Sequence, residues 1–235
     1  MCGRFTQERS SSELAEIFEA EDLADLEGDR FNVAPTDEAN VIVQRSDRRA
    51  VTRYRWGLIP HWADSPKIGS RMFNARAETL ANSAAFRDAF ARKRCLVPVD
   101  SYYEWRREGN LRLPFRIVRD DGRPLTLAGL WDGWKDVETG EIRRTFTIVT
   151  SGPNELMRPI HNRMPVVIPP DAWQRWLDPS LAQPAQLQGL LAPVDDDHLE
   201  AYRVSRLVND VRNNGPDLIE PAPGDLPKAD PALFN

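Results

Sequence analysis

The distribution of apolar positions along the chain predicts a fold dominated by β-strands. Short runs rich in β-branched and aromatic residues, bounded by turn-forming residues, are typical of strands. Such runs occupy residues 40–44, 51–58, 95–99, 115–118, 125–131, 145–150 and 164–168.

Helical spacing of apolar residues occurs in only three places. Residues 11–26 carry Leu14, Ile17, Phe18 and Leu23 at near-helical intervals, after Ser and Glu residues that suit a helix start. Residues 82–92 and 170–177 are further candidates. Because strands and helices do not alternate regularly, a doubly wound parallel sheet is excluded. We expect an α+β fold, with an irregular antiparallel, barrel-like sheet as the core and flanking helices.

The length of 235 residues fits one domain, which we place at 1–220, followed by a Pro-rich C-terminal tail at 221–235. No apolar run approaches the roughly 18 residues of a membrane span, so no membrane partner is expected. The N-terminus lacks export and transit features, which favours a cytoplasmic or nucleoid location. We further expect a monomer.

The net charge of −5 argues against a surface that is basic overall, so any nucleic-acid site must be local. Arginine supplies 27 of the 31 basic residues. Its planar guanidinium suits phosphate oxygens and base stacking, although a GC-rich genome explains the same bias equally well.

The two cysteines, Cys2 and Cys95, are expected to be reduced thiols rather than a disulfide framework. Together with the three histidines they show no spacing typical of zinc ligands, so no metal is expected. The chain also lacks a Gly-rich phosphate loop and a G-x-S-x-G elbow. The sequence therefore predicts no cofactor.

Cys2 becomes the first residue if Met1 is removed, as is usual when a small residue follows methionine. It then carries an α-amine, with a reference pKa of about 7.7–8.0, beside a thiol of about 8.5. The amine can form a Schiff base with an aldehyde, and the thiol can close a thiazolidine ring through the same carbon. For Cys2 considered by itself, the alternative is that a cysteine at position 2 has no functional role.

Three further segments hold polar groups suited to catalysis or DNA binding. In RMFNARAET, Asn74, Arg76 and Glu78 alternate with period 2 and would share one face of an extended segment. Glu104 lies among aromatic residues, where burial would raise its carboxyl pKa, although a structural ion pair fits it equally well. In IHNRMPVVI, His161 and Arg163 precede an apolar strand.

Taken together, several motifs occur in an order that resembles the SOS-response-associated peptidase family, the abasic-site processing proteins. They are MCGRF, FNVAP, WGLIPHW, FNARAET, CLVPVDSYYEW, FTIVTSGPN, IHNRMPVVI and VSRLVNDVRNNG, spanning Cys2 to about Glu220. The resemblance also implies an irregular barrel-like β fold. The chain departs from the family at His61, where many members carry an aromatic residue before the equivalent of Trp62.

The resemblance implies that Cys2 links covalently to the abasic sugar of single-stranded DNA and shields the lesion in the DNA-damage response. It implies that Asn74, Glu104 and His161 surround Cys2 and orient the amine or move protons. Removal of Met1 would be autoproteolytic, and an abasic-site lyase activity through the Schiff base is a further expectation. The residues implied to contact DNA are Arg4, Pro35, Trp62, Arg76, Thr150 and Arg163.

Two other functions remain open on the sequence. One is a cysteine peptidase that uses Cys2, Glu104 and His161 on peptide substrates. The other is a non-catalytic module that binds single-stranded nucleic acid through arginines and aromatic residues. The three functions differ in their requirements: a free α-amine with an aldehyde, a thiolate with a histidine, or neither.

Overall fold

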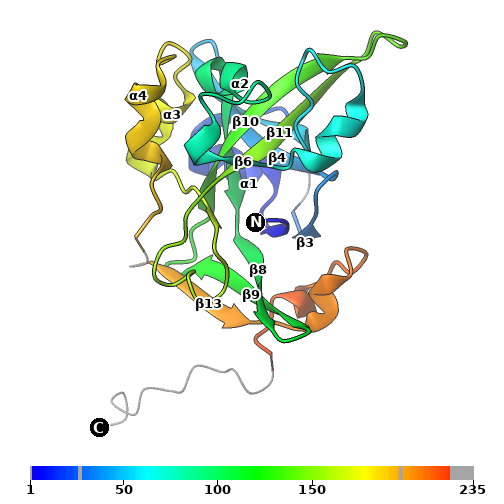
Figure 1. Ribbon diagram of the computed structural model, residues 1–235, viewed down its shortest axis with the longest axis vertical. Coiled ribbons are helices and arrows are strands. Elements are labelled where there is room, and N and C mark those ends of the chain that lie inside the picture. Colours follow the sequence, from blue (N-terminus) through cyan, green and yellow to red (C-terminus); the bar gives the residue numbers. More distant parts are fainter. Residues whose placement is uncertain (1, 26–27, 196–197, 223–235) are drawn as a thin grey trace.

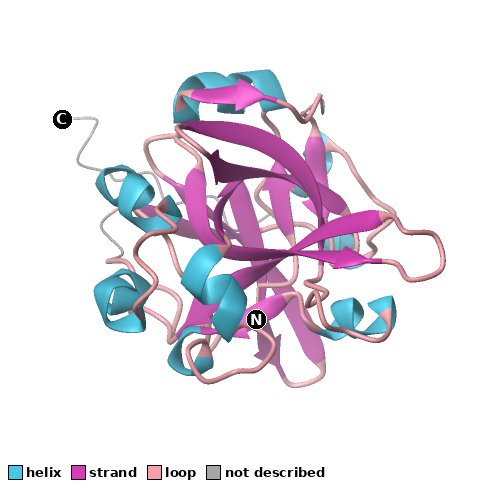
Figure 2. Ribbon diagram, turned by 90° about the horizontal axis from the view of Figure 1, so that it is seen from above, coloured by secondary structure: helices cyan, strands magenta, loops and turns pink. Residues whose placement is uncertain are grey.

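A closed five-stranded barrel forms the centre of the computed structural model, which describes residues 2–25, 28–195 and 198–222 (Figures 1 and 2). Its strands are β4 (Glu38–Arg45), β5 (Arg48–Trp56), β7 (Arg94–Val99), β10 (Leu125–Lys135) and β11 (Ile142–Ser151). Neighbours pair antiparallel in the order β11, β10, β7, β4, β5. A parallel pairing of β5 with β11 closes the ring.

Three short strands extend the barrel. The strand β2 (Ala20–Asp22) runs parallel to β5, while β6 (Asn74–Arg76) runs parallel to β11 and β12 (Met164–Pro165) runs antiparallel to it. Along β11, Phe146 lies opposite Trp56 and Ile148 opposite Asn74. The ends of β5 and β6 therefore follow one another along the same edge of β11.

A second, antiparallel sheet lies below the barrel in Figure 1. In chain order its strands are β1 (Phe5–Gln7), β3 (Arg30–Val33), β8 (Ser101–Glu108), β9 (Leu111–Arg119) and β13 (Leu199–Arg203). In space they follow the order β13, β9, β8, β1, β3. Because β8 starts two residues after β7 ends, the chain passes directly from the barrel into this sheet.

Short helices pack on the outer surface of the barrel (Figure 2). Their apolar side chains form a core with Ile42, Leu96 and Trp176, whereas Phe5, Trp56 and Phe146 belong to a separate core on the inner faces of the strands. The helices are α1 (Ser11–Phe18), α2 (Arg87–Arg92), α3 (Trp173–Leu177) and α4 (Pro184–Leu187), and the 3₁₀ turns are η1 (Pro66–Arg71), η2 (Ala77–Thr79), η3 (Pro170–Ala172), η4 (Gln188–Leu191), η5 (Arg206–Asn209) and η6 (Pro216–Leu218).

The expected α+β class with a barrel-like sheet is confirmed, but some element boundaries were wrong. The helix predicted at 11–26 ends at Phe18, because Glu19 adopts a left-handed conformation (φ 49°) and residues 20–22 form β2. Position 26 lies outside the described residues. The helix predicted at 82–92 begins only at Arg87, and the strand predicted at 164–168 ends at Pro165.

The single domain at 1–220 stays a prediction. The first two residues of the predicted tail pack against the smaller sheet: Pro221 bridges to Val204, and the Ala222 N–H donates to the Arg203 carbonyl at 2.9 Å. Residues 223–235 lie outside the described part of the chain. Among the described residues, no helix has the length and apolarity needed to cross a membrane.

Candidate active site

Cys2 lies in the core between the barrel and the smaller sheet, and its side chain is fully buried. The strand β1 places it there, because Phe5 pairs with Val33 on one side and with Tyr102 on the other. Burial raises the pKa of the Cys2 thiol strongly, and the nearby Glu104 carboxylate adds to the shift. The thiol is therefore protonated at neutral pH.

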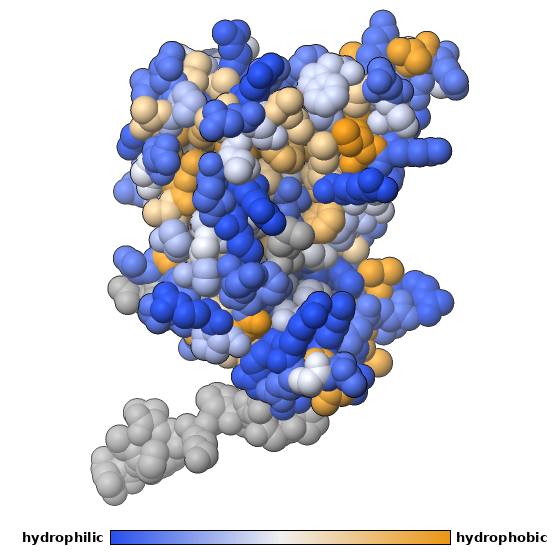
Figure 3. Space-filling view, viewed as in Figure 1, coloured by the Kyte–Doolittle hydropathy of each residue, from blue (hydrophilic) through white to orange (hydrophobic). Residues whose placement is uncertain are grey.

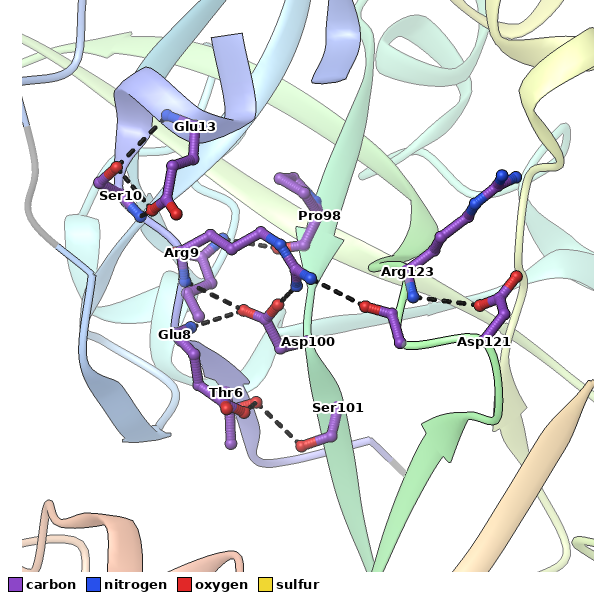
Figure 4. A network of polar contacts seen from close by, with 12 residues as sticks. Thr6, Glu8, Arg9, Ser10, Glu13, Pro98, Asp100, Ser101, Asp121 and Arg123 are labelled. Atoms are coloured by element: carbon purple, nitrogen blue, oxygen red, sulfur yellow. Dashed lines mark hydrogen bonds and ion pairs between the residues drawn. The ribbon is translucent and has the colours of Figure 1, made fainter. Parts of the chain in front are cut away.

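A polar network fixes the far end of β1 (Figure 4). Asp100, in the link between β7 and β8, accepts hydrogen bonds from the backbone N–H groups of Glu8 (2.5 Å) and Arg9 (3.2 Å) and pairs with the Arg9 guanidinium. The hydroxyls of Thr6 and Ser101 are 2.8 Å apart. Since both sheets meet at this link, the network holds the segment that carries Cys2 in a defined position.

Asn74 contacts Cys2 directly. Its side-chain Nδ2 donates a hydrogen bond of 2.7 Å to the Cys2 carbonyl oxygen, from the start of β6. Its Oδ1 is buried and has no hydrogen-bond partner within the described residues. The amide therefore holds the Cys2 backbone and keeps an acceptor available beside it.

Glu104 and His161 form the titratable pair of the site. The Glu104 side chain is almost fully buried, and its Oε1 lies 4.0 Å from Nδ1 of His161. Burial raises the Glu104 carboxyl pKa, against the opposing effect of His161. Nδ1 of His161 lies 3.0 Å from the backbone nitrogen of Arg163 and 3.2 Å from its carbonyl oxygen, so the Arg163 backbone fixes the orientation of the ring.

The segment RMFNARAET does not remain extended as far as the sequence predicted. The strand β6 ends at Arg76, and Glu78 lies in the 3₁₀ turn η2. Glu78 nevertheless meets Arg163, whose two Nη atoms donate to its carboxylate at 2.6 and 3.0 Å. Arg163 also donates to the carbonyl oxygen of the buried Thr150, while Arg76 is exposed beside this pair.

Arg4, expected to contact DNA, makes structural contacts. Its Nη1 donates to Asn32 Oδ1 and to the Val208 carbonyl, both at 2.8 Å. Asn32, which lies in β3, donates to the carbonyl oxygen of Asn213 at 2.9 Å. The motifs MCGRF, FNVAP and VSRLVNDVRNNG are therefore bound to one another.

The two other residues expected on the DNA path differ in exposure. Pro35 is half-buried just after β3, whereas the Trp62 side chain is 49% exposed. The neighbouring His61 turns to Asp132, with its Nδ1 3.0 Å from Oδ2, and Lys93 donates to the other oxygen at 2.6 Å. No group of three or more His, Cys, Asp or Glu side chains within the described residues could hold a metal.

Trp105 is a candidate that the sequence reasoning did not single out. It borders two clefts, one of about 460 Å³ that includes His161 and one of about 360 Å³ that includes Arg4 and Arg112. The Arg4 guanidinium lies 5.6 Å from the centre of its ring. The sequence signal that could have found it is the run Trp105-Arg106-Arg107, an aromatic residue followed by two cations. Figure 3 shows a largely hydrophilic surface over the smaller sheet, to which Trp105 belongs.

A larger basic groove of about 760 Å³ opens beside the site. It begins at Thr36, next to Pro35, and is lined by three exposed cations, Arg55, Lys67 and Arg71, for which no ion pair is found among the described residues. Its wall forms where η1 packs on β5, and the contact is so close that a Cβ at Gly57 (φ +125°) would lie 2.6 Å from the Gly69 carbonyl oxygen. The groove offers several cations to a polyanion.

The arrangement is that of a protein whose second residue, an enclosed cysteine, lies among an amide, a carboxyl group and an imidazole. Comparison with known proteins supplies the family. The model of the SOS response associated peptidase (SRAP) family matches residues 1–211, and the chain belongs to that family.

Relatives from several bacteria cover nearly the whole chain. It is 42% identical to the abasic site processing protein YoqW of Bacillus subtilis, over 94% of this chain and 99% of that protein. It is 32% identical to the abasic site processing protein YedK of Escherichia coli, over 94% and 100%. A crystal structure of a protein from Bacteroides thetaiotaomicron superposes with a TM-score of 0.86 at 29% identity, covering 94% and 100%.

Proposed function

We propose that this protein processes abasic sites in single-stranded DNA by capturing the sugar aldehyde covalently through Cys2, after Met1 has been removed. The observation that carries the proposal is the hydrogen bond from Asn74 to the Cys2 carbonyl beside the Glu104–His161 pair. These contacts hold the residue that would bear the amine next to two proton-handling groups. The names of YoqW and YedK support abasic DNA as the substrate.

The reaction needs no cofactor. The Cys2 α-amine attacks C1 of the ring-opened sugar, and loss of water leaves a Schiff base. The thiol then adds to the same carbon: a C–S bond forms, the C=N π electrons move to nitrogen, and the thiol proton ends on that nitrogen. The product is a thiazolidine that links DNA and protein and shields the lesion.

Each neighbouring side chain has a task in this sequence. Glu104, with its carboxyl pKa raised by burial, takes a proton from the attacking amine. His161 transfers protons while the sugar ring opens. Asn74 fixes the direction of the amine through the Cys2 backbone. The same Schiff base gives the protein a route to β-elimination, which is an abasic-site lyase activity.

DNA binding relies on local cations in a chain of negative net charge. Arg76 lies exposed on β6, two residues from Asn74, and is the cation that we assign to a phosphate beside the lesion. Thr150 lies opposite Arg76 in the β6–β11 pairing, and Arg163 stabilises this edge by donating to the Thr150 carbonyl oxygen and pairing with Glu78. Trp62 and Trp105 offer rings on which unpaired bases can stack. We place the protein, as a monomer, in the cytoplasm, on the nucleoid when bound to DNA.

The peptidase activity in this proposal is limited to autoproteolytic removal of Met1. A peptidase acting on other chains would need Cys2 as a thiolate, and burial raises the pKa of this thiol strongly. A thiol that acts second, on a Schiff base already formed, tolerates that burial. This difference favours aldehyde capture over peptide hydrolysis.

Denaturing electrophoresis tests the proposal. Protein verified by mass to start at Cys2 is incubated with single-stranded DNA that carries one abasic site, and with the same strand intact. A heat-stable shifted band that requires the abasic site is expected. If no such band forms, or if intact DNA gives the same band, aldehyde capture is wrong. Hydrolysis of unrelated peptides with no DNA adduct would favour the peptidase instead.

A further inference from the structure

Tyr102 is a buried residue beside Cys2 to which the reaction described above gives no task. It lies on β8, two residues before Glu104, and successive side chains on a strand alternate between faces. Tyr102 and Glu104 therefore share the face that Tyr103 does not. Tyr102 pairs with Phe5 across the sheet and belongs to the same apolar core as Cys2.

The Tyr102 hydroxyl has no hydrogen-bond partner within the described residues, although the side chain is fully buried. The adjacent Tyr103 donates its hydroxyl to the Phe31 carbonyl at 2.9 Å. Leaving a buried polar group unpaired costs about 1–3 kcal/mol, so native structures rarely contain one without a reason. A second such atom is Oδ1 of Asn74, whose Nδ2 donates to the Cys2 carbonyl oxygen.

The surroundings of the Tyr102 hydroxyl explain what it could bind. Burial raises its pKa well above the ordinary value, and negative charge on Cys2 or on Glu104 would raise it further. The group is therefore a neutral donor in the core that contains Cys2, on the strand face that it shares with Glu104. The backbone N–H of Arg4 acts on the Cys2 thiol in the opposite direction to burial and lowers its pKa.

We propose that the Tyr102 hydroxyl donates a hydrogen bond to the Cys2 sulfur while the thiazolidine ring closes. The inference rests on the function proposed above and assigns a donor to its second step. As the thiol proton leaves, negative charge develops on sulfur in a dry environment. The Arg4 N–H and the Tyr102 hydroxyl then stabilise that charge together, as paired donors stabilise an oxyanion. When sulfur is bonded to carbon, the proton has passed to the ring nitrogen.

The variant Tyr102→Phe tests this role, with Tyr103→Phe as the matched control. Processed proteins react with abasic single-stranded DNA, and samples taken over time are divided in two. Borohydride treatment counts Schiff base and thiazolidine together, whereas heating without borohydride counts only the closed ring. Ring closure in Tyr102→Phe should slow by about 10-fold or more, the effect of losing a hydrogen bond to a charged group, while Schiff base formation keeps its wild-type rate.

The pH profile separates this role from a structural one. Without the donor, the sulfur loses its proton less readily, so closure by Tyr102→Phe should need a higher pH than closure by wild type and by Tyr103→Phe. The melting temperature of Tyr102→Phe should be unchanged or higher, because the hydroxyl has no hydrogen-bond partner among the described residues. Wild-type closure in Tyr102→Phe, equal slowing of both steps, or a lower melting temperature would each overturn the inference.

The function proposed above is tested separately by the wild-type protein in the same assay. If wild type forms no heat-stable adduct, aldehyde capture fails and the role of Tyr102 fails with it. If wild type forms the adduct and Tyr102→Phe forms it equally fast, only the role of Tyr102 is wrong.

Discussion

Replacing Asn74 by aspartate tests whether its amide positions Cys2. The change keeps the shape of the side chain but turns the donor on the Cys2 carbonyl, at 2.7 Å, into an acceptor. Alanine removes the donor and leaves the carbonyl unpaired, which costs about 1 kcal/mol. Aspartate adds repulsion between two acceptors in a buried position, so that the total is about 1–3 kcal/mol. If that energy positions the amine, crosslinking slows roughly 5-fold for Asn74→Ala and up to about 150-fold for Asn74→Asp.

The assay is the single-turnover rate of heat-stable crosslinking, measured with excess protein on abasic single-stranded DNA. Asn82→Asp, at an exposed position before α2, introduces the same charge away from the site and should react at the wild-type rate. Melting curves check that each variant is folded. The positioning role predicts that crosslinking rates fall from wild type to Asn74→Ala to Asn74→Asp. An Asn74→Asp protein that crosslinks as fast as wild type, or faster than Asn74→Ala, would refute it.

Other changes test the remaining groups. Burial raises the Glu104 carboxyl pKa above its value in the unfolded chain, so ionisation of this group lowers the stability of the fold as pH rises from the unfolded pKa through the folded pKa. Glu104→Gln should therefore melt at a higher temperature than wild type at pH 7, with a smaller difference at pH 4. It should also crosslink about 10²–10⁴-fold more slowly, because a base is lost. Equal melting at both pH values would contradict the first effect. Cys2→Ala should keep a borohydride-trappable imine and lose the heat-stable adduct. One residue added before Cys2 moves the α-amine away from the thiol and should also lose the heat-stable adduct; a stable adduct from either variant would exclude the aminothiol mechanism. Arg76→Ala should weaken single-strand binding and lower its salt slope by about 1. Arg55→Glu should weaken binding of long abasic strands more than binding of short ones. An equal effect on both lengths would show that the basic groove lies off the DNA path.

The local sequence pattern predicted most barrel strands because alternating or continuous apolar residues mark them directly. The local pattern could not predict that the barrel closes, because closure depends on a parallel pairing of Trp56 with Phe146 across about 90 residues of chain. The helix predicted at 11–26 failed at Glu19, where a left-handed conformation with no glycine signal ends it. The strand β8 was not among the predicted strands, since its second half, WRRE, is polar.

Prediction of the site depended on the order of motifs rather than on any single residue. The resemblance named Asn74, Glu104 and His161, and the fold brings Asn74 to Cys2 and His161 to Glu104. Local reasoning could not show that Arg4 would be engaged by Asn32 or that Arg163 would pair with Glu78, because these partners lie 28 and 85 residues away. Such pairings appear only once the sheets are assembled.

Burial of Cys2 is consistent with a reaction in which amine and thiol act in sequence. An exposed, ionised thiolate would react with many electrophiles and oxidants. A thiol buried in the core that contains Phe5 and Tyr102 becomes useful only when its carbon target is already attached to the adjacent nitrogen. Attachment through the amine fixes the distance between sulfur and carbon, and a high effective concentration then replaces intrinsic nucleophilicity. The Arg4 N–H, which lowers the pKa of the Cys2 thiol, and the proposed Tyr102 donor then reduce the barrier to sulfur ionisation within the site. Reactivity is thereby restricted to aldehydes that first reach the N-terminal amine.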